Sequence, residues 1–393
     1  MAAEQITARQ LNAMLFLFLA GGFEVFLPRY AAADAGGEAL LCVGLATTLG
    51  LLGAAGVVQL ARCIRGSDLA LYGAAVLGPP LARVAGAWYV LVLVVVAAQS
   101  LAAVGLVGDV VLGWPAAATP PLLFLLAVAC GLVAGRGLSR AARLAEYAAP
   151  VVFLLVLLVG LTALGRVDWA NYGFRGDWGA LARGTVHLLG RFAPAYILLL
   201  VLSSSARAPL SGGAVPAFLA AGLVMAVAVL PVGLYGGGAA AATFMPSLSL
   251  LADSIFGVAP GLFFPGIGLW LLGSLFQVIL GFLLSTILLQ PTAGERGCGF
   301  PLPAGAGIVW CGLLLWSNYG GSYAFGAGYF PYLVFPAAVG LPPLLFLLPA
   351  WRRLMEGRRV PAVVADLLAV AAVRGAVWRE KWRHPWRRRK ELQ

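Results

Sequence analysis

Apolar runs of about twenty residues recur along the whole length of this chain. A transmembrane helix needs about 20 consecutive, mainly apolar residues to cross the hydrocarbon core of a bilayer. Of the 393 residues, 62% are hydrophobic and only 10% are charged. A soluble domain cannot bury that much apolar surface. The runs therefore predict an all-α integral membrane protein that crosses the bilayer many times.

The apolar runs divide into ten segments, each of which is expected to form one transmembrane helix. In chain order they cover residues 8–35, 40–63, 84–112, 118–136, 143–165, 178–206, 214–236, 263–290, 302–319 and 330–350. The sequence thus predicts two parts, a ten-helix membrane domain over residues 1–350 and a basic tail over residues 351–393.

The basic tail carries much of the net charge of +11. Read as a helix, residues 361–386 place apolar side chains, including Trp378 and Trp382, on one face and basic side chains near the end. Short basic amphipathic helices lie on anionic membrane surfaces. We expect an interfacial cytoplasmic helix in contact with anionic lipids, with docking of a partner protein as the alternative. Nucleic acid is not expected as a partner.

Lysine and arginine are unevenly distributed between the two sides of the membrane that ten spans define. With the N-terminus in the cytoplasm, the outer side holds only Arg29, Arg166, Arg175 and Arg183, and Arg191 is left inside a helix. All the other basic residues then face the cytoplasm. Because basic segments stay on the cytoplasmic side, both termini are predicted to be cytoplasmic.

The sequence contains no pattern that is typical of an enzyme or of a metal site. It has two histidines and five scattered cysteines, without a CxxC pair. The HExxH, GxSxG and P-loop motifs are also missing from it. We therefore expect no catalysis, no cofactor and no bound metal.

Two of the ten segments contain residues that break helices near mid-span. In the first segment, AGGFEVFLP (residues 20–28) places two glycines and a proline around Glu24. In the sixth, GRFAP (residues 190–194) places a glycine and a proline around Arg191. Each of these segments opens a set of five, and an odd number of spans reverses the orientation of the second set. This pattern is typical of 5+5 inverted-repeat transporter folds, whose discontinuous helices, here the first and the sixth, form a midplane site.

Glu24 and Arg191 are the charged residues of the two predicted breaks. A carboxylate inside a membrane needs a counter-charge or a proton. Free amides at helix ends can hold an anionic group. We expect Glu24 and Arg191 to face each other, or to face opposite ends of a zwitterionic ligand. An ion pair that only holds two helices together is the alternative.

Other polar residues interrupt the apolar segments. Gln99 lies in the third segment, and Ser274 and Gln277 share one face of the eighth. They are candidates for ligand contacts, with hydrogen bonds between helices as the alternative interpretation.

Charged residues also gather in the predicted outer halves of the first and sixth segments. Arg183, His187 and Arg191 recur every fourth residue and so share one helical face. Together with Arg29 and Asp34 of the first segment, they are expected to line a path to the ligand site. His187 is interpreted as a packing residue, with a proton relay as the alternative.

Three local motifs point to a known family. ITARQ (residues 6–10) precedes the first apolar helix, Leu27–Pro28 follows the glycine break, and ARLAE (residues 142–146) begins the fifth segment. They resemble the I-[ST]-x-x-Q motif, the Leu-Pro pair and the fourth-to-fifth helix region of the spore germination receptor B-subunit family, the GerAB-type permeases. This resemblance covers about the first 175 residues. Beyond them, only the number and length of the helices agree.

The resemblance implies a LeuT-like fold of the amino acid/polyamine/organocation (APC) superfamily in the inner membrane of a spore. It also implies that the chain senses a nutrient germinant, usually an amino acid, together with an A-type subunit and a lipoprotein C-type subunit. The ligand contacts that it implies are Gly21, Gly22, Phe23, Glu24, Gly190, Arg191, Phe192 and Ala193.

Two features depart from the family pattern. The family often has a Phe-Gly-Glu-like element in its sixth helix, where this chain has RFAPAYILL (residues 191–199), and the amphipathic tail is additional. We predict a germinant-sensing subunit, with an amino acid permease coupled to H⁺ or Na⁺ as the alternative. A third class, a scaffolding or water- or ion-conducting membrane subunit, would have no small-molecule site.

Overall fold

The computed structural model describes residues 5–22, 26–64, 69–174, 176–206, 210–243, 245–246, 249–250, 263–293, 302–345 and 347. The predicted interfacial helix of the tail lies outside these residues. The chain divides into two units, Met1–Pro342 and Pro343–Gln393. The arrangement of helices described below is that of the first unit.

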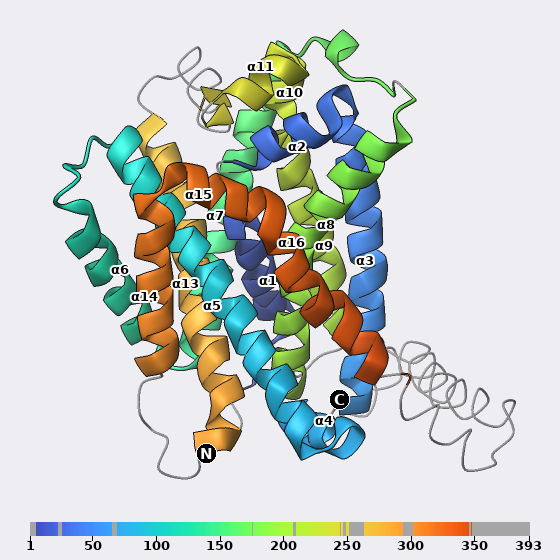
Figure 1. Ribbon diagram of the computed structural model, residues 1–393, viewed down its shortest axis with the longest axis vertical. Helices are drawn as coiled ribbons and strands as arrows, with labels where there is room; N and C mark the ends of the chain where they lie inside the picture. The colour runs from blue at the N-terminus through green and yellow to red at the C-terminus, as the bar shows by residue number, and fades with distance from the viewer. Residues whose placement is uncertain are drawn as a thin grey trace, which may run out of the picture. The chain divides into compact units, whose positions relative to one another are not determined.

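The described part of the chain is almost entirely helical (Figure 1). The elements are α1 (Ala8–Gly22), α2 (Leu27–Ala35), η1 (Gly36–Glu38), α3 (Ala39–Ile64), α4 (Leu69–Leu77), α5 (Pro79–Val110), α6 (Thr119–Ala134), α7 (Leu138–Leu164), η2 (Trp169–Asn171), α8 (Trp178–Val201), η3 (Leu202–Ser204), α9 (Leu210–Ala228), α10 (Leu230–Tyr235), α11 (Gly237–Ala242), α13 (Phe263–Ala293), α14 (Leu302–Ser317), α15 (Tyr319–Ala324), η5 (Phe325–Tyr329), α16 (Phe330–Phe335) and η6 (Pro336–Gly340).

The helices agree with a multi-pass membrane protein. Within the described residues, seven helices are long and apolar enough to cross a membrane, and two more apolar helices are shorter. Each of the ten predicted segments coincides with helical structure, although α1, α6 and α14 are shorter than a usual span, with 15, 16 and 16 residues. The tenth segment begins earlier than predicted, because α15 and η5 precede residue 330.

Helix α1 lies at the centre of the first unit (Figure 1). It packs against α9, α13 and α7, and its residues 13–20 are all buried. A helix that is apolar on every side is expected to be buried on every side. Around α1, α13 packs against α5 and α6, while α3 packs against α8 and α9.

The break predicted in the first segment is present. Helix α1 ends at Gly22, and α2 begins at Leu27 and runs obliquely above α1 in Figure 1. Pro28 lies in the first turn of α2, where its missing N–H costs no helical hydrogen bond. Phe23 and Glu24, both predicted as ligand contacts, lie outside the described residues.

The break predicted at residues 190–194 is absent, and the prediction of a discontinuous sixth helix was wrong. Helix α8 continues from Trp178 to Val201 with Pro194 inside it. A proline removes one N–H donor, and membrane helices tolerate this where neighbouring helices pack around them. Residues 190–201 of α8 are all buried, so packing on every side holds the helix together.

The ITARQ motif starts α1 with a capping box. The Thr7 hydroxyl accepts a hydrogen bond from the backbone N–H of Gln10 at 3.2 Å, and Gln10 Oε1 accepts one from the N–H of Thr7 at 3.0 Å. This reciprocal pair satisfies backbone donors that have no partner within the helix. Just before it, Ile6 is fully buried, and its N–H donates to the carbonyl of Ser205 at 2.9 Å.

The ARLAE motif meets the ITARQ motif in space. Glu146 of α7 lies 2.8 Å from Arg9 Nε and also accepts a hydrogen bond from Gln10 Nε2 at 3.4 Å. Residues from two distant motifs therefore join the start of α1 to α7. The backbone bond from Ile6 joins the same point to the segment that follows α8.

Helix α3 approaches α8 closely because glycines face it. A Cβ atom at Gly53 would lie 2.3 Å from the Tyr196 hydroxyl oxygen, and that hydroxyl donates to the carbonyl of Gly50 at 3.0 Å. We expect Gly53→Ala to displace the hydroxyl and to destabilise the protein by about 1–3 kcal/mol through overpacking. The measurement is the midpoint of thermal unfolding in detergent.

The matched control for this prediction is Gly56→Ala, one helical turn further along α3. A Cβ atom at Gly56 meets nothing within 4 Å. Alanine also favours the helix over glycine, so this midpoint should stay constant or rise slightly. Equal midpoints for Gly53→Ala and Gly56→Ala would contradict the close packing of α3 on α8.

Candidate functional site

Arg191 is a buried cation where α8 meets α2 and the last helical segment. Arg191 is 5% exposed, and its Nη2 atom donates a hydrogen bond to the carbonyl of Gly326 at 3.3 Å. Its Cζ atom lies 4.6 Å from the ring centroid of Phe330 and 5.2 Å from that of Tyr30. Aromatic faces and a carbonyl oxygen present negative charge density, which partly offsets the cost of burying a guanidinium.

The carbonyl that contacts Arg191 belongs to a π-helix. Both η5 and η6 have the π form, which often occurs at functional sites. A Cβ atom at Gly326 would lie 2.3 Å from the Tyr30 hydroxyl oxygen and 3.4 Å from Arg191 Nη2. The missing side chain at position 326 is what allows Tyr30 and Arg191 to reach the backbone of η5.

Aromatic rings stack beside Arg191. The Tyr30 ring stacks on the His187 ring, with centroids 5.0 Å apart, and on the Tyr323 ring, also at 5.0 Å. Arg29 Cζ lies 4.4 Å from the Tyr323 centroid. We call Arg29, Tyr323, Tyr30 and His187 the aromatic row. It joins α2, α8 and α15 through side chains.

Asp34 of α2 pairs with the histidine of the aromatic row. Its Oδ2 atom lies 2.8 Å from His187 Nδ1, and the side chains of His187 and Asp34 are 8% and 31% exposed. The second ring nitrogen, Nε2, is buried and has no hydrogen-bond partner among the described residues. The residues predicted to line a path were Arg29, Asp34, Arg183, His187 and Arg191. The structure connects four of them through Tyr30, Tyr323 and the Asp34–His187 pair, while Arg183 is exposed.

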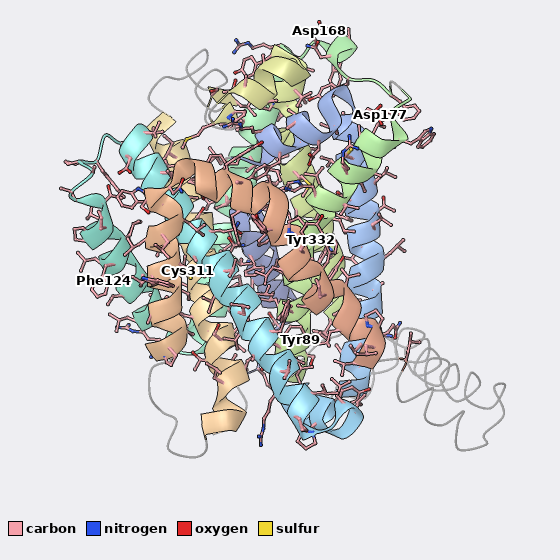
Figure 2. All side chains as sticks on the ribbon, viewed as in Figure 1. Tyr89, Phe124, Asp168, Asp177, Cys311 and Tyr332 are labelled. Carbon is pink, nitrogen blue, oxygen red and sulfur yellow. The ribbon has the colours of Figure 1, made fainter. Side chains whose placement is uncertain are left out.

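These residues lie toward the end of the bundle that holds α2, α10, α11 and the start of α8, which we call the α2 end. Figure 2 shows Asp168 and Asp177 at this end. Their carboxylates cap η2 and α8 by accepting hydrogen bonds from the N–H groups of Ala170 and Ala180. The two acidic caps therefore fix the connection that leads into α8.

A second group of predicted site residues lies between α1, α5 and α13. Gln277 Nε2 donates to the carbonyl of Phe18 at 3.0 Å, and Gln277 Oε1 accepts a hydrogen bond from the Ser100 hydroxyl. The Ser274 hydroxyl donates to the carbonyl of Trp270 within α13 at 3.5 Å. These bonds agree with the alternative interpretation of Ser274 and Gln277, in which polar groups bond within and between helices.

Gly21 brings the end of α1 directly against α13. A Cβ atom there would lie 2.4 Å from the carbonyl oxygen of Gly273 and 3.2 Å from the nitrogen of Ser274. Gly22 is the last residue of α1. Gln99 is buried in α5, which itself packs against α13. Gly21 and Ser274 are thus adjacent, while Arg191 makes its described contacts with other elements.

The remaining predicted residues on α8 differ in what they contact. Phe192 stacks on Phe218 of α9 with centroids 5.5 Å apart, and Ala193 is fully buried. A Cβ atom at Gly190 would lie 3.7 Å from the Phe335 ring. Because α8 is continuous, these residues cannot offer the free backbone amides that a broken helix would have supplied.

Sequence reasoning did not identify Tyr30, Tyr323, Gly326 and Phe330. The predicted tenth segment began at residue 330, so the preceding run of glycines and tyrosines was left outside every span. A signal was available at Tyr30, which directly follows the predicted path residue Arg29. Nothing in the sequence shows that Tyr30 and Tyr323 stack, because they are far apart in the chain.

The close approach of Tyr30 to Gly326 of η5 can be tested by substitution. We expect Gly326→Ala to push Tyr30 away from η5, because the added Cβ would lie 2.3 Å from its hydroxyl oxygen. The overpacking should destabilise the protein by about 1–3 kcal/mol. Gly328→Ala in the same π-helix is the matched control, since its Cβ meets nothing within 4 Å. Thermal unfolding midpoints that fall equally in both variants would show that the contacts of Gly326 are unimportant.

Comparison with known sequences supports the resemblance found in the motifs. The family described as spore germination protein matches residues 5–173. This confirms the predicted resemblance over the first five segments. Among curated proteins, none matches the sequence.

Solved structures share the fold of this chain. Mhp1, a nucleobase-cation-symport-1 family transporter in a closed conformation with bromovinylhydantoin bound, aligns with a TM-score of 0.58 and 13% identity over 90% of this chain and 80% of that chain. A mutant manganese transporter of Eremococcus coleocola aligns with a TM-score of 0.51 and 14% identity over 88% and 77%. The predicted LeuT-like fold is therefore confirmed. The apolar helices and the shared fold together indicate a multi-pass membrane protein.

Proposed function

We propose that this chain, which matches the spore germination protein family over residues 5–173 and has a transporter fold, binds a small amino-acid-like ligand beside Arg191. In this proposal it is the germinant-sensing subunit of a spore germination receptor. The observation that carries the proposal is the buried guanidinium of Arg191 between the rings of Tyr30 and Phe330.

The chemistry of Arg191 supports a ligand with a carboxylate. A guanidinium carries five N–H donors in a planar fork that matches a carboxylate, and it stays charged at any physiological pH. Burial lowers the local dielectric constant and so strengthens its attraction for an anion. The rings of Tyr30 and Phe330 offer apolar surface for the hydrocarbon part of such a ligand.

The break between α1 and α2 supports a zwitterionic ligand. Helix α1 ends at Gly22 with the partial negative charge of its last carbonyl groups, and α2 begins at Leu27 with the partial positive charge of its first amides. Ends of discontinuous helices bind charged groups of substrates in transporters with inverted repeats. Glu24, which follows Gly22 and precedes Leu27 in the sequence, belongs to the proposal as a partner of the ligand's ammonium group or of Arg191.

The setting of the site follows from the family resemblance. In our proposal the chain lies in the spore inner membrane with both termini in the cytoplasm, so that the α2 end faces outward. It would work with an A-type subunit and a lipoprotein C-type subunit, and its basic tail would contact anionic lipids. The second candidate function is an amino acid permease coupled to H⁺ or Na⁺, which the transporter fold favours.

The role of Arg191 can be tested by ligand-induced stabilisation. A ligand at 100 times its dissociation constant stabilises the native state by about 2.7 kcal/mol. We expect at least one of the common L-amino acids to raise the unfolding midpoint of the purified protein, and Arg191→Gln to lose this response. Arg140→Gln, which removes an exposed arginine of α7, should keep it. Equal responses of the two variants would contradict a ligand at Arg191, and no response to any amino acid would favour a scaffolding or conducting subunit.

Sensing and transport differ in net flux. We expect proteoliposomes that contain this chain alone to bind the stabilising amino acid in radiolabelled form without accumulating it under an imposed H⁺ or Na⁺ gradient. Liposomes with Arg191→Gln are the control for binding to the lipid. Concentrative uptake that depends on either gradient would contradict the sensor and support the permease, with the same ligand site.

A further inference from the structure

We propose that His187 and Asp34 form a proton-binding site at the α2 end, and that a proton bound there strengthens the binding of an anionic ligand group at Arg191. The first half of this inference stands on the geometry of the pair. The second half rests on the proposed function, because it needs a ligand at Arg191.

The pair combines a buried ring with a carboxylate that water can reach. His187 is 7% exposed, whereas the side chain of Asp34 is 31% exposed. One ring nitrogen faces the carboxylate at 2.8 Å, and the other is buried without a hydrogen-bond partner among the described residues. Histidine is the side chain whose ordinary titration falls near physiological pH. Through the partly exposed Asp34 carboxylate, the pair lies within reach of water at the α2 end.

The proposed step is the uptake of one proton from water. A neutral imidazole beside an ionised carboxylate becomes an imidazolium beside the same carboxylate. One N–H bond forms at Nε2 as one O–H bond of a hydronium ion breaks to leave water, and the net charge of the protein rises by one. Both ring nitrogens are donors in the imidazolium, so Asp34 keeps its hydrogen bond from Nδ1.

Charged groups of both signs lie on the elements that surround His187. They include Arg29 and Asp34 of α2, Glu38 of η1, and Arg183 and Arg191 of α8, beside the titratable Tyr30 of α2, Cys42 of α3 and Tyr323 of α15. An anion that enters the site adds a negative charge, which stabilises a nearby imidazolium.

Tyr30 and helix α8 connect the pair to Arg191. His187 and Arg191 are four residues apart on one face of α8, and the Tyr30 ring contacts both side chains. A positive charge at His187 repels the guanidinium of Arg191, and an anionic group bound at Arg191 removes that opposition. By linkage, the bound anion then favours the proton, and the proton favours the anion by the same factor.

The proton site can be observed directly by NMR. The chain contains two histidines, His187 and His384, so the His384→Gln variant labelled with ¹⁵N-histidine shows a single imidazole. We expect its nitrogen shifts to change from those of an imidazole to those of an imidazolium between about pH 8.5 and about pH 5. An imidazole that stays neutral throughout this interval would overturn the proton site.

Two aspartate variants in the same background test the role of Asp34. In Asp34→Asn the ratio of imidazolium to imidazole at a given pH should fall about tenfold or more, because the neighbouring negative charge is lost. Asp168→Asn, which removes an exposed cap at the same end of the bundle, should leave the ratio unchanged. Equal ratios in the two variants would overturn the pairing with Asp34.

The coupling is tested with the panel of L-amino acids at about pH 8 and about pH 6. We expect the dissociation constant of the stabilising amino acid to fall about tenfold at the lower pH, and to be equal at both values in His187→Gln. Equal constants in the unmodified protein would overturn the coupling. A panel without any response would overturn the proposed function and the coupling with it, while the NMR result would decide the proton site by itself.

Discussion

The rest of the first unit depends on how helix α1 is held in place, because α1 packs against helices on several sides. At its start, Thr7 and Gln10 form the capping box, which satisfies backbone N–H groups that have no partner within the helix. Near its end, Gln277 of α13 donates a hydrogen bond to the carbonyl of Phe18. The other helices pack around a helix whose position these bonds help to determine.

The polar groups around Gln277 and around Arg191 have different physical roles. Around Gln277 the polar atoms bond to neighbouring backbone and to Ser100, which fixes α13 and α5 against α1. Around Arg191 the described contacts include ring faces and one carbonyl, which stabilise a cation. A guanidinium in a site of low dielectric constant attracts an anion far more strongly than a neutral amide does. This difference is why the proposed ligand is assigned to Arg191.

The sequence predicts most of the fold but only part of the site. Long apolar runs determine the helices, because a bilayer sets their length, and paired glycines before Pro28 mark a real break. The break predicted at Pro194 is absent, since a single proline inside a fully packed helix does not break it. The four-residue spacing of His187 and Arg191 correctly indicated a shared face. The stacking of Tyr30 on Tyr323 could not be predicted from the sequence, because it depends on how α15 packs against α2 in space.

Sensing and transport differ in whether the contacts at the start of α1 must break. A ligand shifts a conformational equilibrium only by binding one state better than the other. Tyr30 of α2 contacts Arg191 of α8, so a movement of α2 relative to α8 would change the site at which we propose the ligand binds. Transport also requires the site to open at the opposite end, where Arg9 pairs with Glu146. Arg9 is 78% exposed there, so this ion pair contributes at most about 1 kcal/mol and opposes opening only weakly. The buried Ile6 and its backbone bond to Ser205 are the stronger restraint, and a chain that only senses has no need to release them.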